Sequence, residues 1–302
     1  MRDINSLPNY PKFTFHSLDN TTTEKQQLLE CLINDLKAIQ HLKAIVLGGS
    51  YAEGMATETS DIDLGLYYDE KTPFNIEEIK QVIKSYEIEP SILTDFYEWG
   101  PYVNGGAWIN TQYGKIDLLY RNITQVKNII EKSQNGDWEN CYEQQPPYGF
   151  LSITYLAETE ICIPLYDPQE IIKELKLTIH KYPQKLKKSI IAQSLWSAEF
   201  TIWHAESFAK QEDIYNLSGC LTRAVKNLIN TLFAINEKYP LGDKRSLERL
   251  NKVTLKPQNL QSKIESILCI EPADIQLNVK RIKLLFNEIK SLTDEYIPLY
   301  KL

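Results

Sequence analysis

The stretch Val46–Tyr68, VLGGSYAEGMATETSDIDLGLYY, decides the fold and the function predicted for this chain of 302 residues. An apolar run over 43–47 predicts a strand that leads into Gly48-Gly49-Ser50, and a polar loop then reaches a second strand at about 62–68. Asp61 and Asp63 stand at the start of that second strand. Residues i and i+2 of an extended strand point to the same face, so we expect the two carboxylates to lie side by side.

These residue types suit a phosphate and a metal ion. Two carboxylates that close repel each other, and Mg²⁺ is the usual compensation because it prefers carboxylate oxygens and keeps positions open for substrate phosphates. Gly48 and Gly49 have no side chains, so a phosphate can approach the backbone, and Ser50 adds an amide and a hydroxyl where a short helix would begin. The stretch therefore predicts phosphoryl or nucleotidyl transfer.

Each half of the stretch is common by itself, as a tight turn or as a loop, but their order is specific. Leu47-Gly48-Gly49-Ser50 followed by Asp61-Ile62-Asp63-Leu64 resembles the signature of the nucleotidyltransferase superfamily of DNA polymerase β. The resemblance implies an enzyme, a transferase of phosphorus-containing groups, that uses one or two Mg²⁺ ions. It also implies that Asp61 and Asp63 bind the metal, and that Gly48, Gly49 and Ser50 bind the nucleotide.

A third acidic residue is expected on a later strand. Asp117 lies in a predicted strand at 115–120, between Ile116 and Leu118, where a buried carboxylate requires either a salt bridge or a metal. Spacing alone supports the two interpretations equally. The resemblance favours the second, because the superfamily places a third acid beside the Asp-x-Asp pair; Asp117 would bind a metal ion or accept the proton of the attacking hydroxyl.

Strands that alternate with helices predict an α/β (α+β) sheet domain in the first half of the chain. Helices are expected at 23–40, from 76 and at 124–133, and strands at 107–111 and 115–120, whereas 86–105 shows no clear pattern. Gln144–Pro147 is the best candidate hinge by composition, which gives a catalytic domain over 1–147, or to about 168 if the helix and strand predicted over 149–168 belong to the sheet. Residues 148–302 are then an all-α bundle, with helices at 186–209, 213–236, 246–251, 258–269 and 273–293.

The helical half supplies basic candidates. Its sequence, including Gly219–Arg223, Leu232–Tyr239 and Gly242–Arg245, is similar to a bacterial branch of the superfamily that includes aminoglycoside nucleotidyltransferases. The resemblance implies a domain that closes over the nucleotide and contacts the triphosphate through a basic residue. Lys226 and Lys244 are the residues nominated for nucleotide binding.

The predicted helix 186–209 carries a polar and aromatic stripe. At 100° per residue, Trp196, Glu199, Trp203 and Glu206 fall within one arc. Aromatic faces attract cations and carboxylates pair with ammonium groups, so the stripe would suit a cationic, hydroxyl-rich acceptor. The alternative is that the tryptophans pack on the sheet domain and the glutamates are solvated, and aromatic stripes are usually packing surfaces.

Composition narrows the partners. The net charge of −7 gives no global basic field for nucleic acid, although a local basic patch would be compatible with it. Five scattered cysteines without CxxC spacing indicate reduced thiols, and no secretory signal or membrane-spanning run is visible. We therefore expect a cytoplasmic protein without a membrane partner.

These observations predict a Mg²⁺-dependent nucleotidyltransferase. The donor is a nucleoside triphosphate, with AMP from ATP favoured, and the acceptor is a hydroxyl of a small antibiotic-like or sugar-like molecule. One alternative is transfer to a macromolecule, at a protein hydroxyl or an RNA 3′ end. Another is a non-catalytic nucleotide-sensing module, against which the intact Asp61, Asp63 and Asp117 argue.

Overall fold

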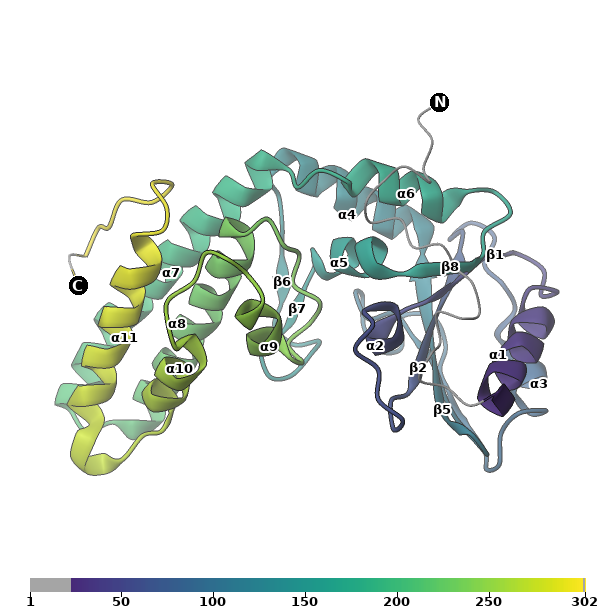
Figure 1. The fold of residues 1–302 in the computed structure, drawn as a ribbon, viewed down its shortest axis with the longest axis horizontal. Coiled ribbons are helices and arrows are strands. Elements are labelled where there is room, and N and C mark those ends of the chain that lie inside the picture. Colours follow the sequence, from purple (N-terminus) through teal and green to yellow (C-terminus); the bar gives the residue numbers. More distant parts are fainter. Residues whose placement is uncertain (1–22, 301) are drawn as a thin grey trace. The chain divides into compact units, whose positions relative to one another are not determined.

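The computed structural model describes residues 23–300 and residue 302, and these fold into two compact units (Figure 1). The first unit contains the described residues up to 131 together with 140–181, and the second contains 132–139 and the described residues from 182 onward. The division at 181/182 lies beyond both boundaries, 147 and 168, that the sequence suggests. Residues 144–147 lie inside the first unit.

A six-stranded sheet with strand order β3-β4-β5-β2-β1-β8 forms the centre of the first unit. Strands β2 and β5 run parallel, and the other neighbouring pairs are antiparallel. A separate ribbon pairs β6 with β7. The strands are β1 Leu42–Leu47, β2 Ile62–Tyr68, β3 Ile92–Leu93, β4 Gly106–Thr111, β5 Gly114–Asn122, β6 Asn140–Cys141, β7 Phe150–Leu151 and β8 Ile163–Tyr166.

One face of this sheet is apolar and lies under two helices, α1 (Thr23–Leu36) and α3 (Ile76–Ile83). Side chains alternate between the faces of a strand, so Leu64, Leu118 and Ala107 all point into this core and are fully buried. The remaining helices of the unit are α2 Gly49–Ala52, α4 Ile123–Asn135, whose end belongs to the second unit, α5 Thr154–Ile161 and α6 Ile171–Ile179. This core leaves the opposite face of the sheet for polar residues.

The second unit is helical, as the sequence predicts. The long helices α7 and α8 pack against each other, and α11 packs on both of them. Asp213 starts α8 by accepting a hydrogen bond from the amide of Asn216 at 3.1 Å. Its helices are α7 Gln184–Lys210, α8 Ile214–Ile235, α9 Ser246–Asn251, α10 Leu260–Leu268 and α11 Ile275–Lys290, with one 3₁₀ turn at Pro272–Asp274. The predicted class, a mixed sheet domain followed by a helical region, is confirmed.

Two local expectations differ from the structure. The first helix ends at Leu36 rather than near 40, because the chain turns there through a hydrogen bond from the amide of Ile39 to the carbonyl of Leu36. The unassigned region 86–105 contains the two-residue strand β3 and a series of turns. Its turns include positive φ angles at Tyr97 and Asn104, which no periodic pattern announces.

Candidate active site

Asp63 and Asp117 lie opposite each other on the neighbouring parallel strands β2 and β5. Residues in register on adjacent strands share a face, so both carboxylates project from the side of the sheet away from α1 and α3. Both residues are partly buried, whereas Asp61 precedes β2 and is exposed. The structure thus brings Asp63 and Asp117 together and leaves Asp61 at the solvent edge of the pair.

Gly48 and Gly49 pack directly against Asp63. The amide of Gly48 donates a hydrogen bond to the carbonyl of Asp63 at 2.8 Å. Gly49 has a φ of +55°, and a Cβ there would lie 1.8 Å from Oδ2 of Asp63. Glycine is therefore required at this position both for the backbone angle and for the room that the carboxylate occupies. Ser50 follows in the first turn of α2.

Helix α5 covers the far end of the same face of the sheet. Tyr67 and Arg121 are in register there and are 2% and 4% exposed. Arg121 forms two hydrogen bonds of 2.8 Å with the carboxylate of Glu158 on α5, and it lies over the ring of Tyr155. Burial raises the pKa of Tyr67 well above its ordinary value, and the nearby Cys162 and Glu158 raise it further. Helix α5 thus covers one end of the face, and the two acids lie toward the other.

Lys25 of α1 connects the segments that carry the site, and the sequence interpretation did not single it out. Its ammonium group donates hydrogen bonds of 3.2 Å to the hydroxyl of Tyr51 and to the carbonyl of Ser60, although the residue is only 7% exposed. Tyr51 is in α2, directly after Gly49-Ser50, and Ser60 directly precedes Asp61. The sequence contains a signal for this role. Lys25 lies on the same helical stripe as Leu29, and a lysine in the first turn of a helix is unfavourable because its charge opposes the helix dipole.

Lys25→Met is expected to lower the free energy of unfolding by about 1–3 kcal/mol, because it removes the donor that satisfies a buried hydroxyl and a carbonyl. Hydrogen–deuterium exchange should also become faster in peptides that cover 50–61. Lys37→Met is the matched control, because Lys37 is an exposed lysine bonded only locally to Asn34. Equal exchange at 50–61 in the two variants would contradict the role assigned to Lys25.

Gly49→Ala is expected to lower the rate of the predicted nucleotidyl transfer by about a hundredfold, since the new Cβ would displace the carboxylate of Asp63 from its place. The matched control is Gly54→Ala. Gly54 also has a positive φ, +70°, but a Cβ there meets nothing within 4 Å. Both variants should lose about 1–2 kcal/mol of stability to the left-handed backbone angle. Only Gly49→Ala should lose activity, and equal activities would show that the contact with Asp63 is unimportant.

The donor set fits a hard divalent cation. Carboxylates are the ligands that Mg²⁺ prefers, and this ion usually takes one or two of them together with substrate phosphates. Within residues 23–300, no group of three or more His, Cys, Asp or Glu side chains is arranged to hold a metal by itself. Metal binding by Asp61, Asp63 and Asp117 stays a prediction.

The nominated lysines lie in the second unit. Lys226 is largely buried on α8, and its ammonium group pairs with Oδ1 of Asp243 at 2.5 Å. Lys244 is exposed in the segment between α8 and α9. The charge of Lys226 is thus compensated within its own unit, and the contacts predicted between these lysines and a triphosphate stay predictions.

One residue of the stripe on α7, Glu199, has a structural role that the sequence does not indicate. Glu199 is fully buried, and its carboxylate accepts hydrogen bonds from the Tyr296 hydroxyl at 2.5 Å and from the amides of Leu299 and Tyr300 at 2.9 Å. The idea that both glutamates are merely solvated is therefore wrong, since Glu199 holds the end of the chain against α7.

The other members of the stripe are more open. Trp196 and Trp203 are 43% and 47% exposed and stack on either side of Phe200. Glu206 forms an ion pair with Lys283 of α11. Acceptor binding by Trp196, Glu199, Trp203 and Glu206 stays a prediction.

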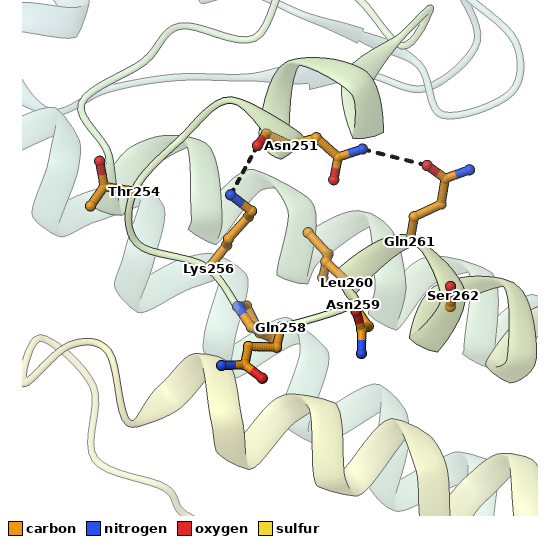
Figure 2. Close-up of a pocket in the computed structure, with 9 residues that line it drawn as sticks. Asn251, Thr254, Lys256, Gln258, Asn259, Leu260, Gln261 and Ser262 are labelled. Carbon is orange, nitrogen blue, oxygen red and sulfur yellow. Dashed lines mark hydrogen bonds between the residues drawn. The ribbon is translucent and has the colours of Figure 1, made fainter.

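A pocket of about 500 Å³ lies in the second unit, among residues 251–262 (Figure 2). Its one lysine, Lys256, donates hydrogen bonds to the carbonyls of Asn251 at 2.9 Å and Val253 at 2.6 Å. The nine described residues that line it include no acid, histidine or cysteine and none of the predicted site residues. The lining of this pocket therefore contains no carboxylate that could bind a metal ion.

Comparison with known proteins supports the class that the first unit indicates. Residues 29–132 match the model of the nucleotidyltransferase domain family, and this range contains Gly48 to Ser50 and all three acids. Residues 153–244 match a domain of unknown function, DUF4037. The chain therefore carries a nucleotidyltransferase domain and is a transferase.

No curated protein matches the chain. A nucleotidyltransferase-like protein from Exiguobacterium sibiricum 255-15 is similar in structure, at 10% identity and a TM-score of 0.44, over 86% of this chain and 74% of that one. None of these matches extends to the aminoglycoside-type branch. Across the described residues, no helix is both long enough and apolar enough to cross a membrane.

Proposed function

We propose that the protein transfers a nucleoside monophosphate, AMP from ATP, to a hydroxyl group of a small sugar-like or antibiotic-like molecule in a Mg²⁺-dependent reaction. The observation that carries the proposal is the register of Asp63 with Asp117 beside Gly49. Two carboxylates at adjacent positions favour a bound cation, and Gly48 and Gly49 leave the backbone beside them without side chains of its own. This combination suits a nucleoside triphosphate better than an uncharged substrate.

Asp63 and Asp117, with Asp61 at the exposed edge, are the residues that would hold Mg²⁺. When bound, the ion would supply charge neutralisation for the phosphates and orient the reacting groups. The backbone at Gly48 and Gly49 would receive the leaving phosphates, with the amide and hydroxyl of Ser50 available as donors. In this scheme Lys226 and Lys244 remain the candidates for further phosphate contacts.

The proposed transfer needs no reactant other than the nucleoside triphosphate and the acceptor. The acceptor oxygen forms a bond to the α-phosphorus, the bond between that phosphorus and the bridging oxygen of the β-phosphate breaks, and pyrophosphate leaves with the electron pair. Asp117 is the candidate to take the proton of the hydroxyl, because it lies beside Asp63 and a carboxylate can act as a general base. Its product is an acceptor joined to the nucleotide by a phosphodiester.

The test uses the intact protein with Mg²⁺ and each of the four α-labelled ribonucleoside triphosphates in turn. The acceptor panel contains neutral cyclic polyols, amine-bearing cyclic polyols, a hydroxyl-bearing protein and an RNA with a free 3′ end. We expect label from ATP to appear on a small polyol and to disappear when Mg²⁺ is chelated. Labelling of the protein or RNA alone would overturn the small-molecule acceptor, and binding without transfer to any member would favour a sensing module.

A further inference from the structure

The row of residues that crosses the sheet at Asp63 and Asp117 continues to an exposed tryptophan. Trp108 of β4 is the direct partner of Asp117 on β5, and Asp117 is the partner of Asp63 on β2. Partners directly opposite on neighbouring strands share a face, so Trp108 lies on the same face as the two acids. Neighbouring strands are about 4.7–4.9 Å apart, which makes the indole an immediate neighbour of Asp117.

Trp99 backs this indole from one side. The two rings stack with centroids 5.0 Å apart and planes 22° from parallel. Gly106 lies two residues before Trp108 in β4, and a Cβ there would lie 1.9 Å from the carbonyl oxygen of Leu118 and 3.0 Å from the ring of Trp99. Trp108 nevertheless remains 40% exposed, so its free surface is on the side that Trp99 does not cover.

The loop that carries Trp99 is fixed by buried polar contacts. The amide of Trp99 donates to the carbonyl of Asn104 at 2.8 Å, and the side chain of Asn104, which is fully buried, bonds to the amide of Tyr97 and to the hydroxyl of Tyr68. From another segment, the side chain of Gln144 donates to the carbonyl of Trp99 at 3.3 Å. The aromatic pair is therefore held in place before any ligand arrives.

We propose that Trp108, supported by Trp99, is the platform on which the acceptor's ring lies while its hydroxyl reaches Asp117. This inference rests on the proposed function, and it adds the acceptor side of the site. Gly48 and Gly49 adjoin Asp63 on the side away from Asp117, and Trp108 adjoins Asp117 on the opposite side. In an in-line displacement the attacking oxygen approaches opposite the leaving pyrophosphate, so phosphates at the glycines direct the acceptor to the tryptophan.

The occupant that fits is a saturated ring with hydroxyl groups. An indole face is broad and apolar and receives the C–H face of such a ring, while the adjacent carboxylate accepts a hydrogen bond from its hydroxyl. The acidic surroundings also favour a neutral or cationic ring over an anionic one. A nucleobase would stack on the same surface, so the experiment must separate the two.

The experiment compares Trp108→Ala and Trp108→Phe with the wild type and with Tyr142→Ala, an exposed aromatic of the first unit at 69%. Binding of a non-hydrolysable ATP analogue with Mg²⁺ reports on the donor side. The KM for a cyclic polyol in α-label transfer reports on the acceptor side. The indole N–H signal of Trp108 in NMR, assigned from the Phe variant, is followed during titration with a neutral cyclic polyol, an amine-bearing one and a ribonucleoside.

We expect the polyols to shift the Trp108 signal and Trp108→Ala to raise the acceptor KM by about tenfold or more, with donor affinity changed less than about twofold. Trp108→Phe should recover part of the loss, and Tyr142→Ala should change neither value. An unshifted signal with both polyols, or a shift with the ribonucleoside alone, would overturn the proposal. If the wild type fails to bind Mg²⁺ and the ATP analogue, the proposed function fails, while the polyol titration still decides whether Trp108 is a ligand site.

Discussion

Asp63→Asn is expected to reduce nucleotidyl transfer by about a thousandfold while the fold persists, since the variant removes a charge that would hold the cation. Asparagine has nearly the same shape as aspartate, so the packing against Gly49 and the register with Asp117 should survive. Initial rates of α-label transfer at saturating ATP, together with thermal unfolding, measure the two effects separately.

The control for this prediction is Asp69→Asn. Asp69 follows the end of the same strand, where its side chain accepts a hydrogen bond from the amide of Lys71 at 2.9 Å, and an asparagine oxygen can still accept that bond. Its transfer rate should stay near that of the wild type. If Asp63→Asn folded and transferred label at the rate of this control, the metal role of the acid pair would be wrong.

Arg121→Met is expected to cause the largest loss in the free energy of unfolding, about 3 kcal/mol, because it leaves the carboxylate of Glu158, on α5, without its charged partner. The side chain of Arg121 is 5% exposed, that of Glu158 is 25% exposed, and two hydrogen bonds of 2.8 Å join them. Burial acts to lower the pKa of Arg121, but Glu158 and the nearby Tyr155 raise it above the ordinary value, so this guanidinium stays charged. The partial exposure of Glu158 places the loss near the lower end of the usual range.

Urea denaturation of Arg121→Met and of Lys80→Met measures this difference. Lys80 pairs with Glu77 at 3.3 Å on the exposed surface of α3, where both side chains are about half exposed or more. Such a pair contributes about 0–1 kcal/mol. The double variant Arg121→Met, Glu158→Leu should regain part of the loss, because no uncompensated carboxylate remains. Equal losses at Arg121 and Lys80 would mean that α5 is not held by this pair.

The periodic spacing of apolar residues was sufficient to predict the regular strands and helices. The alternation that buries Ile62, Leu64 and Leu66 in β2 predicts that strand, and the same argument places Asp63 on its other face. The apolar spacing of the long helices predicts α7 and α8. The same spacing does not predict that Asp117 lies next to Asp63, because this contact depends on the parallel pairing of β5 with β2.

Tertiary pairing decides the features that the pattern did not reveal. Trp99 and Trp108 are separated by turns with positive φ angles, and their stacking depends on the buried Asn104. From its sequence position, Glu199 is expected to be a polar surface residue, but in the structure the segment near Tyr296 forms hydrogen bonds with it. In each case a residue acquires its role from a distant segment, and periodicity carries no information about that segment.

The central claim is that the chemistry occurs at the α-phosphate, on the row formed by Gly49, Asp63 and Asp117. The most direct measurement compares ATP labelled at the α-phosphate with ATP labelled at the γ-phosphate, each incubated with Mg²⁺, a polyol acceptor and either the wild type or Asp63→Asn. The wild type should transfer only the α-label and release one pyrophosphate per acceptor modified, and the variant should transfer the α-label about a thousandfold more slowly. Transfer of the γ-label, or α-label transfer that persists unchanged in Asp63→Asn, would contradict it.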